Sequence, residues 1–160
     1  MTVDEGTLRQ IYNYRRLSDL VATTGQPMEA ELTAVAEAGF EVVVNLGLHD
    51  TEYALPDERK AVESLGMRYI HIPVVWERPT RADLEEFFKV MDALAGKPVL
   101  VHCAANKRVS VFMALYRRLR HDWAPGATLP DVQAIWEPDA VWRQFMEEMT
   151  QQLVTRHSSA

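Results

Sequence analysis

Short runs of apolar residues alternate along the chain with longer stretches in which apolar positions recur every three or four residues. The runs at 40–46, 67–75 and 99–101 have the length and composition of strands buried in a sheet. Strands that alternate with helices are typical of an α/β fold, here with a central, mostly parallel sheet flanked by helices. The helical spacing predicts helices over 27–38, 57–65, 81–94, 108–121, 131–136 and 139–154.

Proline, glycine and capping residues mark where several of these helices begin and end. Pro27 stands at the first position of one helix, and Gly39 follows its last turn. Gly66 closes the next helix, and Thr80 is a candidate N-cap for the one after it. The predicted elements therefore have defined boundaries.

Length and charge favour a single globular domain and exclude several partners. The 160 residues suit one domain over 1–160 with its core at about 15–155, a loose lead-in before it and a frayed tail at 157–160. The 17 Lys and Arg against 23 Asp and Glu give a net charge of −6, so we expect neither nucleic acid nor an anionic membrane as a partner. The sequence has no membrane-span pattern and no signal-peptide pattern, and a cytoplasmic location is expected.

The single cysteine excludes an internal disulfide and cysteine-rich zinc sites. His49 and Asp50 follow a predicted strand, but two residues are too few to indicate a metal, so we expect loop hydrogen bonds there. His71 lies within a predicted strand and is interpreted as structural. We expect neither a metal nor a cofactor.

The stretch VLVHCAANKRVSVFMALYRR, residues 99–118, places a cysteine between a strand and a helix. Ligands bind α/β sheets at the carboxyl ends of strands, which is where His102 and Cys103 lie. The N–H groups of a short loop and of a helix N-terminus stabilise a thiolate and bind a tetrahedral anion. Arg108 follows the cysteine by five positions, and its guanidinium can hold two oxygens of that anion. A nucleophilic sulfur below a bound oxyanion is what covalent catalysis requires.

The neighbours of the cysteine have candidate roles of their own. Ser110, in the first turn of the helix, is a candidate to assist departure of the thiolate. The order of strand, loop, arginine, serine and helix favours a catalytic or anion-binding cysteine over a small buried hydrophobic residue. Candidate substrate-binding residues, which hold the loop or present its N–H groups, are His102, Ala104, Ala105, Asn106 and Lys107.

The segment HCAANKRVS resembles the signature of the cysteine-dependent protein tyrosine and dual-specificity phosphatase superfamily, with Cys103 in place of its nucleophile and Arg108 in place of its phosphate-binding arginine. The segment ATTGQPMEAELTAVAEAGFEVVVNLG is similar to one found in the small bacterial phosphatase-like branch, formerly a domain of unknown function. The segments ALPDE and YIHIPV and the helix start at Pro79 and Thr80 add to a resemblance that covers roughly residues 15–120. It implies a phosphatase-like fold.

The loop departs from the usual pattern of that superfamily. Four residues separate Cys from Arg where five are usual, and an ungapped match would put Ser110 on the signature serine and Val109 on the arginine position. Either Arg108 is displaced into the same role or the anion pocket is altered. Asn106 and Lys107 replace glycines, and asparagine tolerates a left-handed backbone better than most residues. Four-residue spacings occur in the small bacterial branch and also in rhodaneses, whose shorter loop suits a persulfide.

The general acid is the second departure. The resemblance implies an Asp shortly after the Ile-Pro-Val strand, to protonate the leaving oxygen. Trp76 stands at or near that position, and Glu77 and then Asp83 are the next carboxylates. A solvated turn residue is the alternative interpretation of Glu77. Asp50 and Asp57, on another loop, are further candidates.

These observations predict a phosphate monoester hydrolase that acts through a phosphocysteine intermediate at Cys103. Its substrate would be a phosphorylated protein or a small-molecule phosphate ester. One alternative is a rhodanese-like sulfurtransferase that carries a persulfide on the same cysteine. Another is a catalytically weak module that binds phosphate or phosphoproteins, which the missing Asp and the short loop favour.

Overall fold

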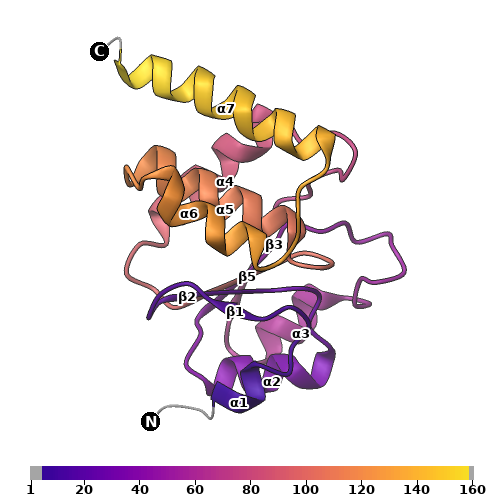
Figure 1. Cartoon of the computed structure of the whole chain (residues 1–160). Coiled ribbons are helices and arrows are strands. Elements are labelled where there is room, and N and C mark those ends of the chain that lie inside the picture. The colour runs from indigo at the N-terminus through magenta and orange to yellow at the C-terminus, as the bar shows by residue number, and fades with distance from the viewer. Residues whose placement is uncertain (1–4, 159–160) are drawn as a thin grey trace.

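A five-stranded sheet runs through the middle of the molecule (Figure 1). The computed structural model describes residues 5–158, with side chains to residue 154. The strands are β1 (Arg15–Arg16), β2 (Val21–Thr24), β3 (Val42–Asn45), β4 (Arg68–His71) and β5 (Val99–His102). In space they follow the order β1-β2-β5-β3-β4, and all pairs are parallel except β1 with β2. This confirms the predicted α/β class and the mostly parallel sheet.

The sequence pattern predicts β3, β4 and β5 but misses β1 and β2. Strand β2 has the four residues Val-Ala-Thr-Thr and is not part of a longer apolar run. Parallel pairing with β5 holds it in the sheet, with Ala22 opposite Leu100 and Thr24 opposite His102. Because that partner is distant along the chain, the local pattern carries little of the signal for this strand.

Helices cover the sheet in two layers (Figure 1). One layer contains α1 (Glu5–Leu8), α2 (Glu29–Glu37) and α3 (Glu58–Ser64), and the other α4 (Arg81–Ala93), α5 (Lys107–Arg120), α6 (Pro125–Gln133) and α7 (Ala140–Ser158). Among the described residues, none of these helices is long and apolar enough to cross a membrane.

Alternate residues of the buried strands face the two helical layers. Val43 and Leu100 pack with the core under α1, α2 and α3. The neighbouring positions Val42, Val44 and Val101 pack with the core under the other four helices. A side-chain period of two along each strand accounts for this division, and it explains why the strands are apolar throughout rather than alternating.

The register of the sheet sets the position of the cysteine. Strand β5 lies between β2 and β3, and its last residue, His102, pairs with Thr24 on one side and Asn45 on the other. Cys103 follows directly, at an edge where three parallel strands end together. That edge is where α/β sheets place their ligands.

The two ends of the domain differ from the expectation. Leu8 and Ile11, in the expected loose lead-in, are each 1% exposed and belong to the core. Helix α6 begins at Pro125 rather than at residue 131, because proline suits the first position of a helix. Helix α7 continues to Ser158, into the expected tail, and residues 159–160 lie outside the described part of the chain.

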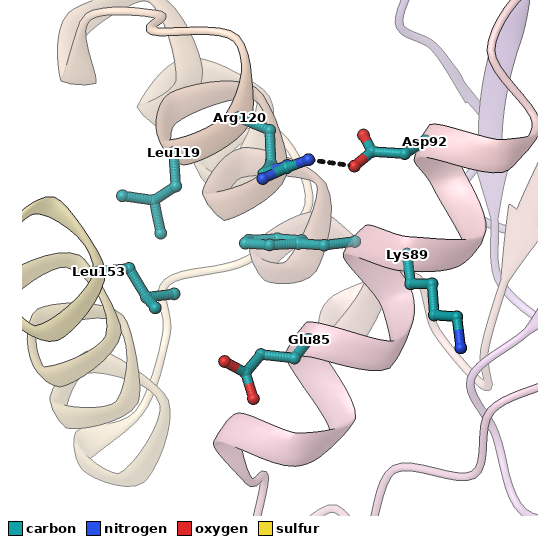
Figure 2. Close-up of a pocket in the computed structure, with 7 residues that line it drawn as sticks. Glu85, Lys89, Asp92, Leu119, Arg120 and Leu153 are labelled. Carbon is teal, nitrogen blue, oxygen red and sulfur yellow. Dashed lines mark hydrogen bonds and ion pairs between the residues drawn. The ribbon is translucent and has the colours of Figure 1, made fainter. Parts of the chain in front are cut away.

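Helix α7 packs along α5 and encloses a groove with α4 (Figure 2). Trp142 and Phe145 pack on Phe112 of α5, with ring centroids 6.1 and 5.9 Å away. A cavity of about 560 Å³ remains between the three helices, beside an ion pair of Asp92 with Arg120 (Figure 2). The other residues that line it are Glu85, Phe88, Lys89, Leu119 and Leu153.

Gly25 brings the chain after β2 into close contact with the loop after β5. It forms an antiparallel bridge with Ala105. A Cβ atom at Gly25 would lie 2.6 Å from the ring of Tyr12 and 2.7 Å from the backbone oxygen of Ala104. The backbone oxygen cannot rotate away as a side chain would, so any larger residue at this position must displace the loop.

We expect Gly25→Ala to lower the free energy of unfolding by about 1–3 kcal/mol, because the added methyl group overpacks this contact. Urea unfolding of the variant and the wild type measures the change. Gly126→Ala is the matched control, since a Cβ there meets no atom within 4 Å and the position is helical. That variant should be unchanged or more stable by up to about 1 kcal/mol. Equal stability of Gly25→Ala and the wild type would contradict the close contact.

Candidate active site

The loop at 103–106 turns the chain from β5 into α5. Asn106, the residue before the helix, has a left-handed backbone conformation with a φ of 66°, which agrees with its expected substitution for a glycine. Its side-chain amide donates to the backbone oxygen of Asn13 at 2.8 Å and to the hydroxyl of Thr23 at 2.9 Å. Asn13 in turn donates to the backbone oxygen of Ala105 at 2.9 Å. The N-terminal segment therefore holds the loop in shape.

Cys103 lines a cavity of about 360 Å³ and is itself only 1% exposed. The predicted loop residues Ala104, Ala105 and Lys107 line the same cavity, and so does Arg108. Asn106 and His102 are buried away from it. The structure thus brings together the candidate nucleophile, the candidate anion-binding arginine and most of the loop between them.

Arg108 is 4% exposed and is fixed by two hydrogen bonds. Its Nη1 donates to the backbone oxygen of Val74 at 2.8 Å, and its Nη2 donates to the hydroxyl of Tyr53 at 3.2 Å. The guanidinium carbon lies 5.9 Å from the ring centroids of both Tyr53 and Trp76. Its Nε is buried and has no hydrogen-bond partner among the described residues. Because buried donors are normally paired, this one is available to a bound anion.

Ser110, the candidate to assist departure of the thiolate, makes two hydrogen bonds, neither of them to the thiol. Its hydroxyl donates to the backbone oxygen of Lys107 at 2.7 Å, as serines within helices commonly do. It also accepts a hydrogen bond from the indole Nε1 of Trp136 at 3.0 Å. The observed hydroxyl therefore joins the start of α5 to Trp136 and lies outside the residues that line the cavity.

A buried, hydrogen-bonded pair of a histidine and a glutamate lies behind the cysteine. Nε2 of His102 is 2.5 Å from the Glu58 carboxylate, and Nδ1 is 3.3 Å from the backbone oxygen of Cys103. An oxygen atom therefore faces each ring nitrogen of the imidazole. The Glu58 carboxylate also accepts from Gln26 at 2.9 Å. Burial alone would raise the pKa of Glu58, but the hydrogen bonds from His102 and Gln26 outweigh burial and hold that pKa below its ordinary value.

The candidate general acids lie in different places. Glu77 is exposed and lines the cavity. Asp83 does not reach it, because its carboxylate accepts from the backbone N–H of Thr80 at 3.3 Å in a capping box at the start of α4. Asp57 likewise caps α3, and Asp50 is exposed outside the lining. Of the carboxylates considered from the sequence, Glu77 is the one at the cavity.

Trp76 lines the cavity and packs against two tryptophans from the C-terminal part of the chain. The indole Nε1 of Trp142 donates to the backbone oxygen of Trp76 at 3.0 Å, and the two ring centroids lie 5.6 Å apart. The ring centroids of Trp136 and Trp76 lie 5.4 Å apart, and the ammonium of Lys107 lies 5.5 Å from the centroid of the Trp136 ring. This aromatic cluster connects the region after α6 to the mouth of the site.

His49 and His71 form a hydrogen-bonded cluster beside the chain that follows β3. Their rings are stacked at 3.7 Å, His49 Nε2 lies 2.7 Å from the Tyr69 hydroxyl, and His71 Nε2 lies 2.6 Å from the backbone oxygen of Gly47. Burial lowers the pKa of His71. These contacts agree with the expected loop and structural roles. In the described part of the chain, no group of three His, Cys, Asp or Glu side chains could hold a metal ion.

Three residues that build the site are not found by sequence reasoning. Glu58 lies in the ALPDE segment and could have been considered from the resemblance, but nothing local marks it as a partner of His102. Tyr53 and Asn13 lie in irregular segments without a motif. Each reaches the site by a contact that is distant along the chain.

A parallel sheet that delivers a cysteine to a short loop, with a buried arginine at the start of the following helix, defines the class of the cysteine-dependent phosphatases. The chain belongs to the family described as "DSP-PTPase phosphatase fused to NAD+ Kinase", whose model matches residues 5–128. This confirms membership of the protein tyrosine and dual-specificity phosphatase superfamily, in its small bacterial phosphatase-like branch.

Solved structures agree with this assignment. A DUF442 protein from Shewanella putrefaciens CN-32, assigned provisionally as a phosphatase, is 32% identical with a TM-score of 0.84. That match covers 94% of this chain and 99% of the other. Tk-PTP in its active form is 26% identical with a TM-score of 0.71, over 90% of this chain and 97% of the other.

A curated relative is much longer than this chain. The Beta-lactamase hydrolase-like protein of Agrobacterium fabrum is 30% identical over 103 residues, which is 62% of this chain. The matched part is 24% of that protein's length. The chain therefore corresponds to about a quarter of this relative.

We expect Glu58→Gln to lower the free energy of unfolding by about 1–3 kcal/mol at pH 7, because His102 loses its buried carboxylate partner. The low pKa of Glu58 in the folded state stabilises the wild type at neutral pH, and that stabilisation is lost as pH falls through the folded pKa. The difference between the two proteins should therefore shrink below about pH 4.

Urea unfolding at several pH values measures this difference. Glu63→Gln is the matched control, since Glu63 lies on the same helix and forms an exposed ion pair with Arg59. We expect it to change stability by less than about 0.5 kcal/mol. A difference between Glu58→Gln and the wild type that does not depend on pH would contradict the charged state of the carboxylate.

Proposed function

We propose that this protein hydrolyses phosphate monoesters through a phosphocysteine intermediate on Cys103. One observation carries the proposal. The thiol lines a cavity together with Arg108, whose buried Nε has no partner among the described residues. A guanidinium beside a nucleophile, at the N-terminus of a helix, suits a tetrahedral dianion.

Binding precedes the chemistry. The N–H groups of the loop from Ala104 to Arg108 and the guanidinium of Arg108 hold the three equatorial oxygens of the phosphoryl group. The buried pair of His102 and Glu58 lies behind Cys103, with Nδ1 of His102 facing the Cys103 backbone oxygen. Lys107 adds a second cation at the cavity.

The reaction proceeds in two displacements. The Cys103 thiolate attacks phosphorus, the ester P–O bond breaks, and Glu77 gives its proton to the leaving oxygen. Water then attacks the phosphocysteine, Glu77 takes a proton from that water, and the P–S bond breaks to release phosphate and restore the thiolate. The substrate is a phosphate ester of a protein or of a small molecule, and it binds against the aromatic wall formed by Tyr53 and Trp76.

Sulfur transfer is the second candidate function. Four residues separate Cys103 from Arg108, and the one carboxylate among the described residues that line the cavity, Glu77, is exposed. Persulfide chemistry needs no acid at that position. The cysteine would take the outer sulfur of thiosulfate, release sulfite, and pass the sulfur to a thiophilic acceptor such as cyanide.

Hydrolysis of para-nitrophenyl phosphate between about pH 5 and 8 tests the main proposal. We expect Cys103→Ser to abolish turnover and Arg108→Ala to reduce it by about 10²–10⁴-fold. Arg143→Ala, at an exposed position of α7, is the control for loss of an arginine and should be unchanged. A wild type no faster than Cys103→Ser would sink the phosphatase proposal, and thiosulfate:cyanide activity would then support sulfur transfer.

Glu77→Gln tests the assignment of the acid. Phenyl phosphate has a poorer leaving group than para-nitrophenyl phosphate and depends more on protonation. We therefore expect this variant to lose about 10²-fold in kcat on phenyl phosphate and much less on para-nitrophenyl phosphate. Glu52→Gln, an exposed carboxylate outside the cavity lining, is the control. Equal losses of Glu77→Gln on the two substrates would exclude Glu77 as the acid.

A further inference from the structure

Tyr53 reaches the same cavity as Cys103 from the segment between β3 and α3. Its hydroxyl accepts a hydrogen bond from the backbone N–H of Leu48 at 2.8 Å. It accepts a second from Nη2 of Arg108 at 3.2 Å. The hydroxyl is therefore fixed beside the guanidinium that the proposed function assigns to phosphate binding.

The hydrogen bonds of this hydroxyl leave its own proton without an acceptor among the described residues. A phenol oxygen carries one proton and has acceptor capacity besides it. The two observed bonds are both accepted, so they occupy that capacity and leave the O–H proton to be donated. Within the described part of the chain, no acceptor for that proton is found, and Tyr53 lines the cavity. The proton is therefore available to an acceptor inside the cavity.

The ring of Tyr53 is held in place by its neighbours. A Cβ atom at Gly47 would lie 3.1 Å from both Cε1 and the hydroxyl oxygen of Tyr53, so this glycine allows the ring to approach. The Gly47 backbone is itself fixed, because its N–H donates to Asn45 at 2.7 Å and its oxygen bonds His71 at 2.6 Å. A donor held this way needs no reorganisation when a ligand arrives.

We propose that the Tyr53 hydroxyl is a catalytic residue that donates a hydrogen bond to a phosphoryl oxygen of the bound substrate. The inference rests on the proposed function. Because the hydroxyl bonds Nη2 of Arg108, the proposal assigns its proton to the equatorial oxygens that this arginine would bind and not to the leaving group. The hydrogen bond from a prepositioned donor at this place becomes stronger as negative charge develops on those oxygens.

Tyr53→Phe tests the proposal, because it removes the hydroxyl and keeps the ring against Gly47 and Arg108. We expect kcat/KM to fall by about 10²-fold, by the same factor on para-nitrophenyl phosphate and phenyl phosphate. Binding of orthovanadate, measured by calorimetry, should weaken by at least about 10-fold. Tyr12→Phe, which removes an exposed tyrosine hydroxyl outside the cavity, should leave both values unchanged.

The Arg108→Lys background separates direct donation from positioning of the arginine. Lysine lacks the Nη2 donor that bonds Tyr53. If the hydroxyl contacts the phosphoryl group, Tyr53→Phe still weakens orthovanadate binding in that background. If Tyr53 only positions the arginine, Tyr53→Phe causes no further loss of orthovanadate affinity in that background, and the proposal is overturned.

Failure of the proposed function would give a different result. A wild type that binds orthovanadate but hydrolyses no ester excludes the phosphatase reaction, while the effect of Tyr53→Phe on orthovanadate affinity still decides the role of the hydroxyl. A wild type that binds no orthovanadate overturns both.

Discussion

The side-chain amide of Asn106 makes two hydrogen bonds that leave the loop and reach other parts of the chain, at Asn13 and Thr23. A left-handed residue before a helix has a cost that these bonds offset. With the turn closed this way, Cys103 and the first turn of α5 face one cavity. The short loop, the buried arginine and the contact of Gly25 with Ala105 all depend on that turn.

Burial decides which parts of this fold could be predicted. Strands β3 and β5 are covered on both faces, so their apolar runs are unbroken and the sequence predicts them. Cys103, the loop and Arg108 follow one another directly in the sequence, so this motif can also be recognised without the structure. Glu58, Tyr53 and Asn13 meet the site across 44, 55 and 92 residues of chain, and pairing at that range leaves no periodic signal. Asp83, the other expected acid, lies outside the cavity lining, and its carboxylate completes the capping box at the start of α4.

The sign of the charge at the site is opposite to the net charge of the whole chain. The net charge is −6, yet Lys107 and Arg108 line the cavity with Glu77 as their counterpart, and a buried His102 with Glu58 lies behind them. The rings of Tyr53 and Trp76 lie near the guanidinium, and Arg108 is almost fully buried. Positive charge next to low-polarity walls acts more strongly than it would in water. An acidic protein can in this way hold an anion at one point.

Cys103 is the one cysteine in the 160 residues, and it lies in the cavity rather than elsewhere in the core. Every thiol in a solution of this chain therefore lines this cavity. One equivalent of an alkylating or disulfide-exchange reagent counts accessible cavities, and a spin label or fluorophore attached through sulfur reports on the cavity alone. An anion that occupies the cavity should slow that labelling, so occupancy can be followed without knowing the natural substrate.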